Sequence, residues 1–253
     1  QPGYFLVRAC CPAGVLTPAR LASLAEASAR FGNGRLHLTT RQNVQIHGVR
    51  LGVVEPALRW LAAAGISTRG GGGNTVRNVT VCADAGVCAE ERFDVAPWAA
   101  AVARELLADR RAVTLPRKFK VSFAGCRRDC DGATVNDLGF IAAERDDVAG
   151  FAVYVGGGMG ARCRVGELFL PFVPAGEAAS VARAVLQVFD EHGDRQNRHH
   201  ARLRFLLADV GLARFCELFE AARRSLIETT GGALPSAPFP AGSFDYINVN
   251  NVL

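Results

Sequence analysis

Residues 115–130 read LPRKFKVSFAGCRRDC, and this stretch decides the fold of the larger part of the chain. Apolar and polar residues alternate along KFKVSFA, which predicts a β-strand. Side chains two residues apart share one face of a strand, so Lys118 and Lys120 are expected side by side. The strand runs into a glycine-containing loop with Cys126 and Cys130, a C-x3-C pair.

A second cysteine pair lies upstream, in the segment VCADAGVCAEER at residues 81–92. The strand-like sequence TVRNVTVC enters this loop, and Cys82 and Cys88 form a C-x5-C pair among small residues. Eight cysteines in a chain without an export signal favour metal or redox chemistry over a disulfide framework. The other four lack paired spacing and are expected to be small buried apolar residues: Cys10, Cys11, Cys163 and Cys216.

The spacing of the paired cysteines favours an iron–sulfur cluster over a zinc ion. Thiolates at strand ends suit a metal because strands fix the loops and small residues leave room. Structural zinc prefers tighter C-x2-C knuckles, which neither pair forms, whereas a four-iron cluster is larger and tolerates wider loops. Zinc remains the alternative.

The first part of the chain predicts a ferredoxin-like layer of helices on an antiparallel sheet. Residues 17–32 combine an N-cap, Thr17, with Pro18 at the first helical position and Gly32 as a stop, which indicates a helix. The remaining elements are a strand at 4–10, one or two strands at 35–49, a helix at 54–65 and a short strand at 66–70. This order predicts a ferredoxin-like half-domain over residues 1–70, closed by the glycine run at 70–73.

The pattern then changes to a mixed α/β domain over residues 74–228. Strands are expected at 75–82, 118–126, 137–144 and 150–158, and helices at 95–109, 175–191, 198–210 and 212–227. Residues 229–253 are rich in proline and glycine and are expected to form an irregular tail. The fold class is therefore α+β, with both cysteine pairs at strand ends.

Composition excludes several classes of protein. Of 253 residues, 49% are hydrophobic and 21% charged, which is typical of a globular protein, and no apolar run is long enough to cross a bilayer. The N-terminus lacks the layout of a secretory signal, so a cytoplasmic location is expected. The net charge of +5 is scattered and has few aromatic residues near it, so we expect no nucleic-acid partner.

A glycine loop, YVGGGMGA at residues 154–161, satisfies the G-x-G-x-x-A pattern of dinucleotide-binding folds. Glu177 lies about twenty residues further on, as such a fold requires. A dinucleotide loop opens directly into a helix, however, whereas residues 162–174 contain two prolines and alternate like a strand. The loop is therefore expected to pack against another flat ligand.

Basic residues gather on the strands that lead to the cysteines: Arg41, Arg77, Arg117, Lys118 and Lys120. Because the strand with Lys118 and Lys120 continues to Cys126, we expect these charges near the metal. Such a site would hold a small oxyanion and supply charge and protons during its reduction.

Six motifs together resemble the sirohaem-containing sulfite and nitrite reductases. They are GRLHLTTRQNVQIHG, NTVRNVTVC, LPRKFKVSFAGCRRDC, DLGF, GFAVYVGGGMG and GDRQNRHHARLRFLL, in the order of that family. The resemblance implies a 4Fe–4S cluster on Cys82, Cys88, Cys126 and Cys130, with the Cys130 sulfur also bridging to sirohaem iron. It implies that Arg41, Arg77, Lys118 and Lys120 bind the anion. It also implies that Arg117, Gly156, Gly157, Gly158 and Gly160 meet the macrocycle, whose eight carboxylates account for the basic excess.

The resemblance also implies an activity and partners. The expected reaction is the six-electron reduction of sulfite to sulfide. The alternatives are nitrite reduction to ammonia, a non-catalytic cluster-bearing subunit and a corrin-pathway monooxygenase relative. The large family members contain two repeats that divide the anion-binding residues from the cysteines, whereas this chain has one repeat with both. We therefore expect a homodimer or heterodimer, with electrons from a separate donor protein.

Overall fold

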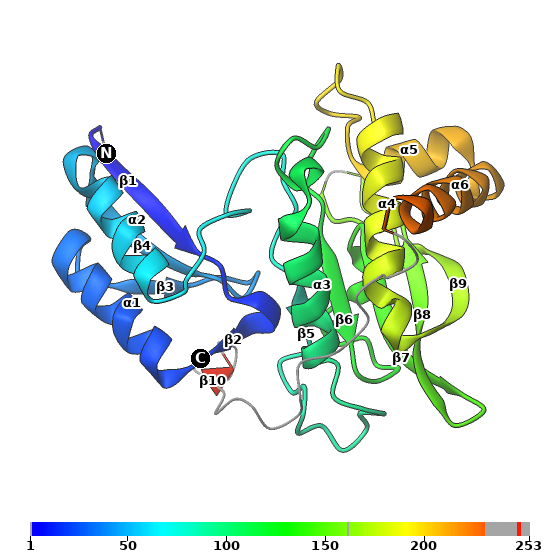
Figure 1. The fold of residues 1–253 in the computed structure, drawn as a ribbon, viewed down its shortest axis with the longest axis horizontal. Helices are drawn as coiled ribbons and strands as arrows, with labels where there is room; N and C mark the ends of the chain where they lie inside the picture. Colours follow the sequence, from blue (N-terminus) through cyan, green and yellow to red (C-terminus); the bar gives the residue numbers. More distant parts are fainter. Residues whose placement is uncertain (1, 161, 231–246, 249–253) are drawn as a thin grey trace.

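The computed structural model describes residues 2–160, 162–230 and 247–248, which form two lobes of α+β structure (Figure 1). The smaller lobe contains a three-stranded antiparallel sheet in the order β1-β4-β3. Its strands are β1 (Tyr4–Ala9), β3 (Leu36–Leu38) and β4 (Val44–Arg50), and its helices are α1 (Pro18–Phe31) and α2 (Val54–Ala63). The predicted ferredoxin-like layering is confirmed.

Helix α1 begins and ends where the sequence predicts. The Thr17 side chain accepts a hydrogen bond from the Arg20 backbone N–H at 3.2 Å, which caps the first turn. Its buried face, with Leu24, packs with Ile46 of β4 and Leu61 of α2 in one small core.

The short strand predicted at residues 66–70 does not form. Only one backbone hydrogen bond ties this segment to the end of β1, from Cys10 N to Ser67 O at 2.7 Å. The chain then turns at Gly70, whose φ of +77° takes it out of the extended conformation. The sheet of the small lobe therefore has three strands in the described part of the chain.

The larger lobe contains a five-stranded mixed sheet in the order β5-β6-β7-β8-β9. Its strands are β5 (Thr80–Val81), β6 (Val121–Ala124), β7 (Leu138–Arg145), β8 (Val148–Val155) and β9 (Glu167–Pro174). The first three strands run parallel, and β7, β8 and β9 are antiparallel neighbours. Alternate residues such as Phe123, Phe140 and Phe151 face a core that includes α3 (Ala96–Ala108) and α4 (Ala178–His192).

Two further helices complete this lobe, α5 (Leu203–Val210) and α6 (Leu212–Thr230). The helix predicted at 198–210 starts five residues later. Arg202 has an extended backbone, and its side chain pairs with buried Asp137, which holds the segment before α5 out of a helix. Short 3-10 helices lie at Pro12–Gly14, Leu51–Val53, Arg110–Val113, Ala133–Val135 and Ala175–Glu177.

The predicted irregular tail is wrong at two places. Helix α6 continues to Thr230, and β10 (Ile247–Asn248) pairs with β2 (Val15–Leu16) of the small lobe. The rest of the predicted tail lies outside the described residues. Within the described part of the chain, no helix combines the length and apolarity needed to cross a membrane.

Candidate functional site

The four paired cysteines gather at one end of the five-stranded sheet. Cys82 directly follows β5, and Cys126 follows β6 after a single glycine. Because β5 and β6 are parallel neighbours, their carboxyl ends bring the two loops together. Cys82 and Cys126 are buried, Cys88 is half-buried and Cys130 is exposed, and all four thiols are free.

Direct contacts hold the two cysteine loops against each other. Arg92 N donates to Gly125 O at 2.9 Å, which joins the two loops, and within the first loop the Glu91 carboxylate accepts from Gly86 N at 2.6 Å. A Cβ on Gly125 would overlap the Glu91 side chain, so a larger residue before Cys126 would displace this carboxylate. The sequence reasoning missed this role of Glu91.

The thiols fit a cluster better than a single ion. Burial raises the pKa of Cys82 to about 11, and charge repulsion from Cys130 and Cys126 adds to that rise, so the three sulfurs are neighbours. Yet across residues 2–160, 162–230 and 247–248 no three His, Cys, Asp or Glu side chains converge as ligands of one metal ion. Four neighbouring cysteines from two loops match the donor set of a 4Fe–4S cluster.

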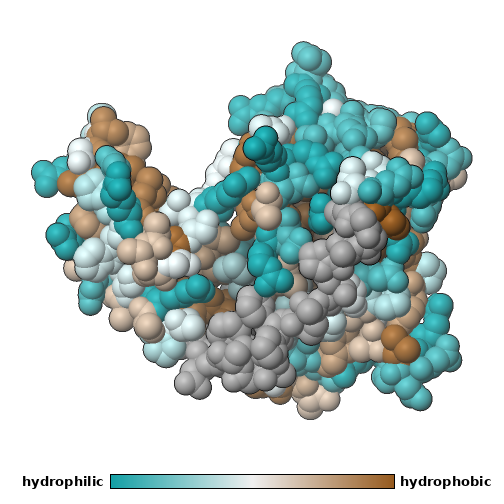
Figure 2. All heavy atoms as spheres, in the orientation of Figure 1, coloured by the Kyte–Doolittle hydropathy of each residue, from teal (hydrophilic) through white to brown (hydrophobic). Residues whose placement is uncertain are grey.

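A cavity of about 530 Å³ lies between the two lobes and contains the predicted oxyanion-binding side chains. Figure 2 shows the hollow between the lobes, with hydrophilic side chains along the rim of the larger lobe. The basic residues that line the cavity are Arg8, Arg41, Arg77, Lys118 and Lys120. Burial, together with the positive charges of Arg41, Arg202 and Lys118, lowers the pKa of Lys120 to about 8.

Arg77 and Arg41 differ in the donors that they leave free. Arg77 donates to Gly71 O at 3.1 Å and to Gly73 O at 2.8 Å, while its buried Nε has no hydrogen-bond partner among the described residues. A buried donor without a partner is costly unless a ligand satisfies it. Arg41 donates at 2.6–2.9 Å to Asn78 O, Asn136 Oδ1 and Val121 O. Arg41 therefore braces the two lobes, and two of its five donors remain.

A second cationic cavity, of about 420 Å³, shares Lys118 with the first. Its lining contains Arg117, Lys118, Arg162, Arg198, Arg202 and Arg204 with His199 and His200, and no carboxylate among the described residues. The buried Nε atom of Arg204 has no hydrogen-bond partner among the described residues, so it is free to donate to an acceptor on a bound ligand. A group with many carboxylates, such as sirohaem, fits this donor set.

The glycine loop borders the second cavity, and close packing explains three of its glycines. A Cβ on Gly156, Gly157 or Gly158 would overlap, respectively, Leu207, the Thr134 carbonyl or the Arg204 side chain. Gly160 has a φ of +122° and is exposed. In the described residues 162–174 the chain leads into strand β9 rather than into the helix that a dinucleotide site needs, as predicted.

Sequence reasoning missed Arg202 and Asp137, which tie the site together. Arg202 donates to both carboxylate oxygens of Asp137, at 3.1 and 2.7 Å, and the Asp137 carboxylate also accepts from Lys120 N at 2.9 Å. Asp137 is fully buried. Asp137 belongs to the motif DLGF and Arg202 to the motif GDRQNRHHARLRFLL, and their opposite charges are the signal that could have paired them.

One expectation about the site is wrong: the lysines and the cysteines of one chain lie at opposite ends of the sheet. Lys120 precedes β6, and its backbone carbonyl accepts from Leu138 N at 3.1 Å, at the start of β7. Cys126 lies beyond the far end of the same strand. In Figure 1 the teal segment that follows β5 hangs below the sheet, whereas the segments before β6 and α5 lie above it. The strand leads to the cysteine, but its length separates the two groups.

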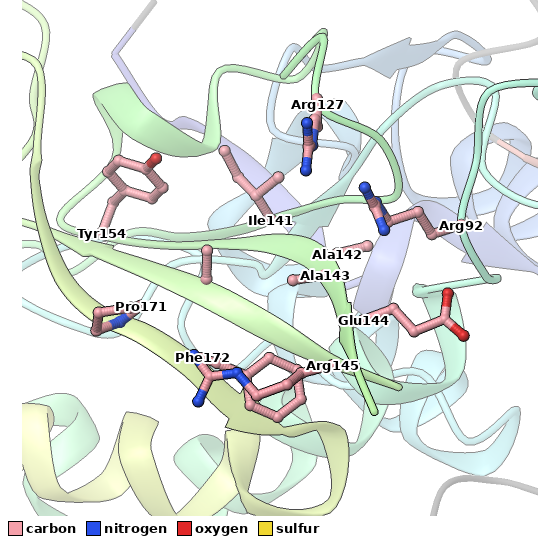
Figure 3. A pocket seen from close by; sticks show the side chains of 11 residues that line it. Arg92, Arg127, Ile141, Ala142, Ala143, Glu144, Arg145, Tyr154, Pro171 and Phe172 are labelled. Atoms are coloured by element: carbon pink, nitrogen blue, oxygen red, sulfur yellow. The ribbon is translucent and has the colours of Figure 1, made fainter. Parts of the chain in front are cut away.

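A third cavity, of about 490 Å³, lies on the sheet face that turns away from α3 and α4 (Figure 3). Arg92 and Arg127, one from each cysteine loop, point toward it over Ala142. Ile141, Tyr154 and Phe172 of β7, β8 and β9 also line it.

The predicted buried character of the other cysteines holds for Cys10 and Cys11 and is wrong for Cys163, which is exposed.

Comparison with known proteins identifies the family. Residues 72–224 match the nitrite and sulphite reductase 4Fe-4S domain, and residues 1–64 match the nitrite/sulfite reductase ferredoxin-like half domain. The chain belongs to the nitrite and sulfite reductase family. The match to the first model contains all four paired cysteines and the cations Arg77, Lys118 and Lys120.

Relatives in the family include both nitrite and sulfite reductases. An assimilatory ferredoxin-dependent nitrite reductase from Haloferax mediterranei is 34% identical over 87% of this chain and 40% of its own length. The hemoprotein beta-component of an NADPH sulfite reductase from Acidithiobacillus ferrooxidans is 32% identical over 86% of this chain and 44% of its own length. The chain thus spans less than half of these relatives.

Two solved structures share the fold. The NirA protein of Mycobacterium tuberculosis superposes with a TM-score of 0.79 at 30% identity, covering 94% of this chain and 42% of that protein. Dissimilatory sulfite reductase I superposes with a TM-score of 0.73 at 15% identity over 86% of this chain and 69% of that one.

Proposed function

We propose that this chain binds a 4Fe–4S cluster and sirohaem and reduces sulfite to sulfide. The observation that carries the proposal is the pairing of two preorganised sets on one chain: four free thiols at the carboxyl ends of β5 and β6, and two cationic cavities at the other end. Cys82, Cys88, Cys126 and Cys130 would hold the cluster, and the second cavity would hold the sirohaem carboxylates. When bound, these groups supply single electrons at low potential.

Lys118, Lys120 and Arg77 would bind and orient the oxyanion. Their charges line one partly desolvated cavity, where electrostatic stabilisation is stronger than in water. The Nζ atom of Lys120, with its pKa lowered to about 8, can hold and release a proton near neutral pH. Sulfite, six electrons and six protons give sulfide and three water molecules, so a nearby proton donor is required.

Sulfite is proposed as the preferred substrate because it carries about two negative charges near neutral pH, whereas nitrite carries one. Several fixed cations stabilise a dianion more than a monoanion. Nitrite reduction to ammonia is the second candidate, since nitrite reductases from Haloferax mediterranei and Synechococcus elongatus are each 34% identical to this chain.

The electron donor is proposed to be a separate protein of the ferredoxin type, since several relatives are named as ferredoxin-dependent enzymes. The proposal retains the cytoplasmic location and the two domains at 1–70 and 74–228. Steady-state assays with reduced methyl viologen test the function. Sulfite-dependent oxidation of the dye supports it, and a sirohaem-loaded protein that oxidises the dye with neither anion contradicts it.

A further inference from the structure

The hairpin turn of the small lobe reaches across to the edge of the large sheet. This turn, residues 39–43, joins β3 to β4, and Thr39 N donates to Asn43 O at 2.9 Å. Strand β5 is the edge strand of the five-stranded sheet on the side of the small lobe (Figure 1). The backbone groups on the outer side of β5 therefore need partners from outside the sheet.

Gln42 supplies such partners at the last residue of β5. Its side-chain Nε2 donates to Val81 O at 2.6 Å, and Val81 N donates to Gln42 Oε1 at 3.1 Å. Two residues earlier, Val79 O accepts from Ala13 N of the small lobe at 3.1 Å. Since Cys82 directly follows Val81, Gln42 fixes the backbone from which the first cysteine loop starts.

The conformation of Gln42 is strained, which distinguishes it from an ordinary contact between lobes. Its side chain is buried, and its backbone φ of +54° lies in the left-handed region, which non-glycine residues rarely adopt. Gly14 leaves the space that the Gln42 amide fills, because a Cβ there would lie 2.8 Å from Gln42 Oε1. A strained backbone of this kind persists only where the surrounding contacts fix it, and the two bonds to Val81 are such contacts.

The preceding residue, Arg41, reaches the segment of the second cysteine loop. Its Nη2 donates to Val121 O at 2.6 Å, and its Nη1 donates to Asn136 Oδ1 at 2.7 Å. Asn136 is buried, and its Nδ2 donates at 2.7 Å to the carbonyl of Gly132, two residues beyond Cys130. One turn of the small lobe is thus connected by hydrogen bonds to both cysteine loops.

We propose that Gln42 and Asn136 are positioning residues for the 4Fe–4S cluster. Gln42 fixes the backbone before Cys82, and Asn136 fixes the loop that contains Cys130. The surroundings of the cysteine ligands, including hydrogen bonds and solvent access, set the properties of such a cluster. Arg41 also lines the anion cavity, so the same turn links the anion-binding cations to the cluster ligands. This inference rests on the proposed function.

Loss of iron from the purified, cluster-loaded protein to a chelator tests the proposal. Gln42→Met keeps the length of the side chain but loses both hydrogen bonds to Val81, so the chelator should remove iron about tenfold faster. Asn136→Ala, which leaves the Gly132 carbonyl without this donor, should also release iron faster, by a smaller factor. The g values of the reduced cluster in the EPR spectrum should shift in both variants, because a ligand changes its position.

Ser28→Ala is the matched control. It removes one buried side-chain hydrogen bond of the same lobe, from Ser28 Oγ to Arg35 O at 2.8 Å, between α1 and the start of β3. It should lower the stability to urea but leave the iron release and the g values of the wild type. Equal rates of iron loss in Gln42→Met and in this control would overturn the role of Gln42, and wild-type rates and g values in Asn136→Ala would overturn the role of Asn136.

Circular dichroism checks that the variants fold. If Gln42→Met does not fold, Asn136→Ala decides alone, and wild-type iron release and g values in that variant then overturn the proposal. A wild-type protein that contains no iron would contradict the proposed function itself. A cluster-loaded wild type whose variants are unaltered would contradict only the positioning of the cluster by the small lobe.

Discussion

Lys120 and Cys126 lie at opposite ends of β6, the strand that the sequence motif LPRKFKVSFAGCRRDC encodes. One continuous motif thus supplies a lysine at one end of the strand and a cysteine beyond its other end. Residues that are close in the sequence were expected to form one site. Strand β6 is extended, so the residues before it and after it lie at two separate places in the structure. The chain spans 40–44% of the length of the two relatives from Haloferax mediterranei and Acidithiobacillus ferrooxidans.

Replacing Lys120 with asparagine should lower sulfite reduction more than nitrite reduction. Removing one cation costs a dianion more than a monoanion in the same cavity. We expect kcat/KM for sulfite to fall by at least about tenfold, which is roughly 1.4 kcal/mol of transition-state stabilisation. Assays of both anions with reduced methyl viologen measure the ratio, and equal losses would contradict the sulfite preference.

The pH dependence of sulfite binding should report Lys120. Burial and neighbouring cations lower the pKa of this amine to about 8, so the cationic form is lost as pH rises through that value rather than near 10.5. The sulfite dissociation constant of the oxidised protein should therefore increase above about pH 8. Lys120→Arg keeps its charge and should move this limb to higher pH. If the sulfite dissociation constant of the variant increases over the same pH range as that of the wild type, the titrating group is not Lys120.

Breaking the pair between Arg202 and Asp137 should destabilise the fold. Arg202→Met would leave a fully buried carboxylate without its cation, which typically costs about 3–5 kcal/mol of unfolding free energy. Urea unfolding measures the change, and the double variant Asp137→Asn with Arg202→Gln should lose less. A loss below about 1 kcal/mol would mean that the pair behaves like an exposed ion pair.

The cysteines should separate into two groups. Cys130→Ser is expected to lose cluster iron and the absorption that depends on it, since its sulfur is one of the four proposed cluster ligands. Cys216→Ser, on helix α6 and outside both cysteine loops, should keep the wild-type absorption spectrum. Equal loss of iron from both variants would show that the partition of the cysteines is wrong.

Local signals predicted most of the elements. The alternation of apolar and polar residues before Cys126 predicts strand β6, and the Thr17 cap with the Gly32 stop predicts helix α1. Both predictions succeed because interactions between residues close in the sequence determine these elements. Tertiary contacts decided the failures. The pairing of Arg202 with Asp137 delays the start of α5, and residues 66–70 form one backbone hydrogen bond to the segment after β1, too few to make a strand of the sheet.

The composition of the site could be predicted better than its arrangement. Residue types and spacing identify the four cysteines and the two lysines as chemically competent groups. Their separation depends on strand direction: β5 and β6 are parallel, so residues before the strands and residues after them lie at opposite edges of the sheet. Strand length alone, at ~3.3 Å per residue, already argues against contact between Lys120 and Cys126.

The metal content and absorption spectrum of the purified protein, expressed in a host that makes sirohaem, test the central claim most directly. Four cluster thiols and a carboxylate-binding cavity on one chain predict about four cluster irons and one sirohaem per chain, with visible absorption that sulfite perturbs. A colourless protein that contains zinc in place of iron would contradict the account.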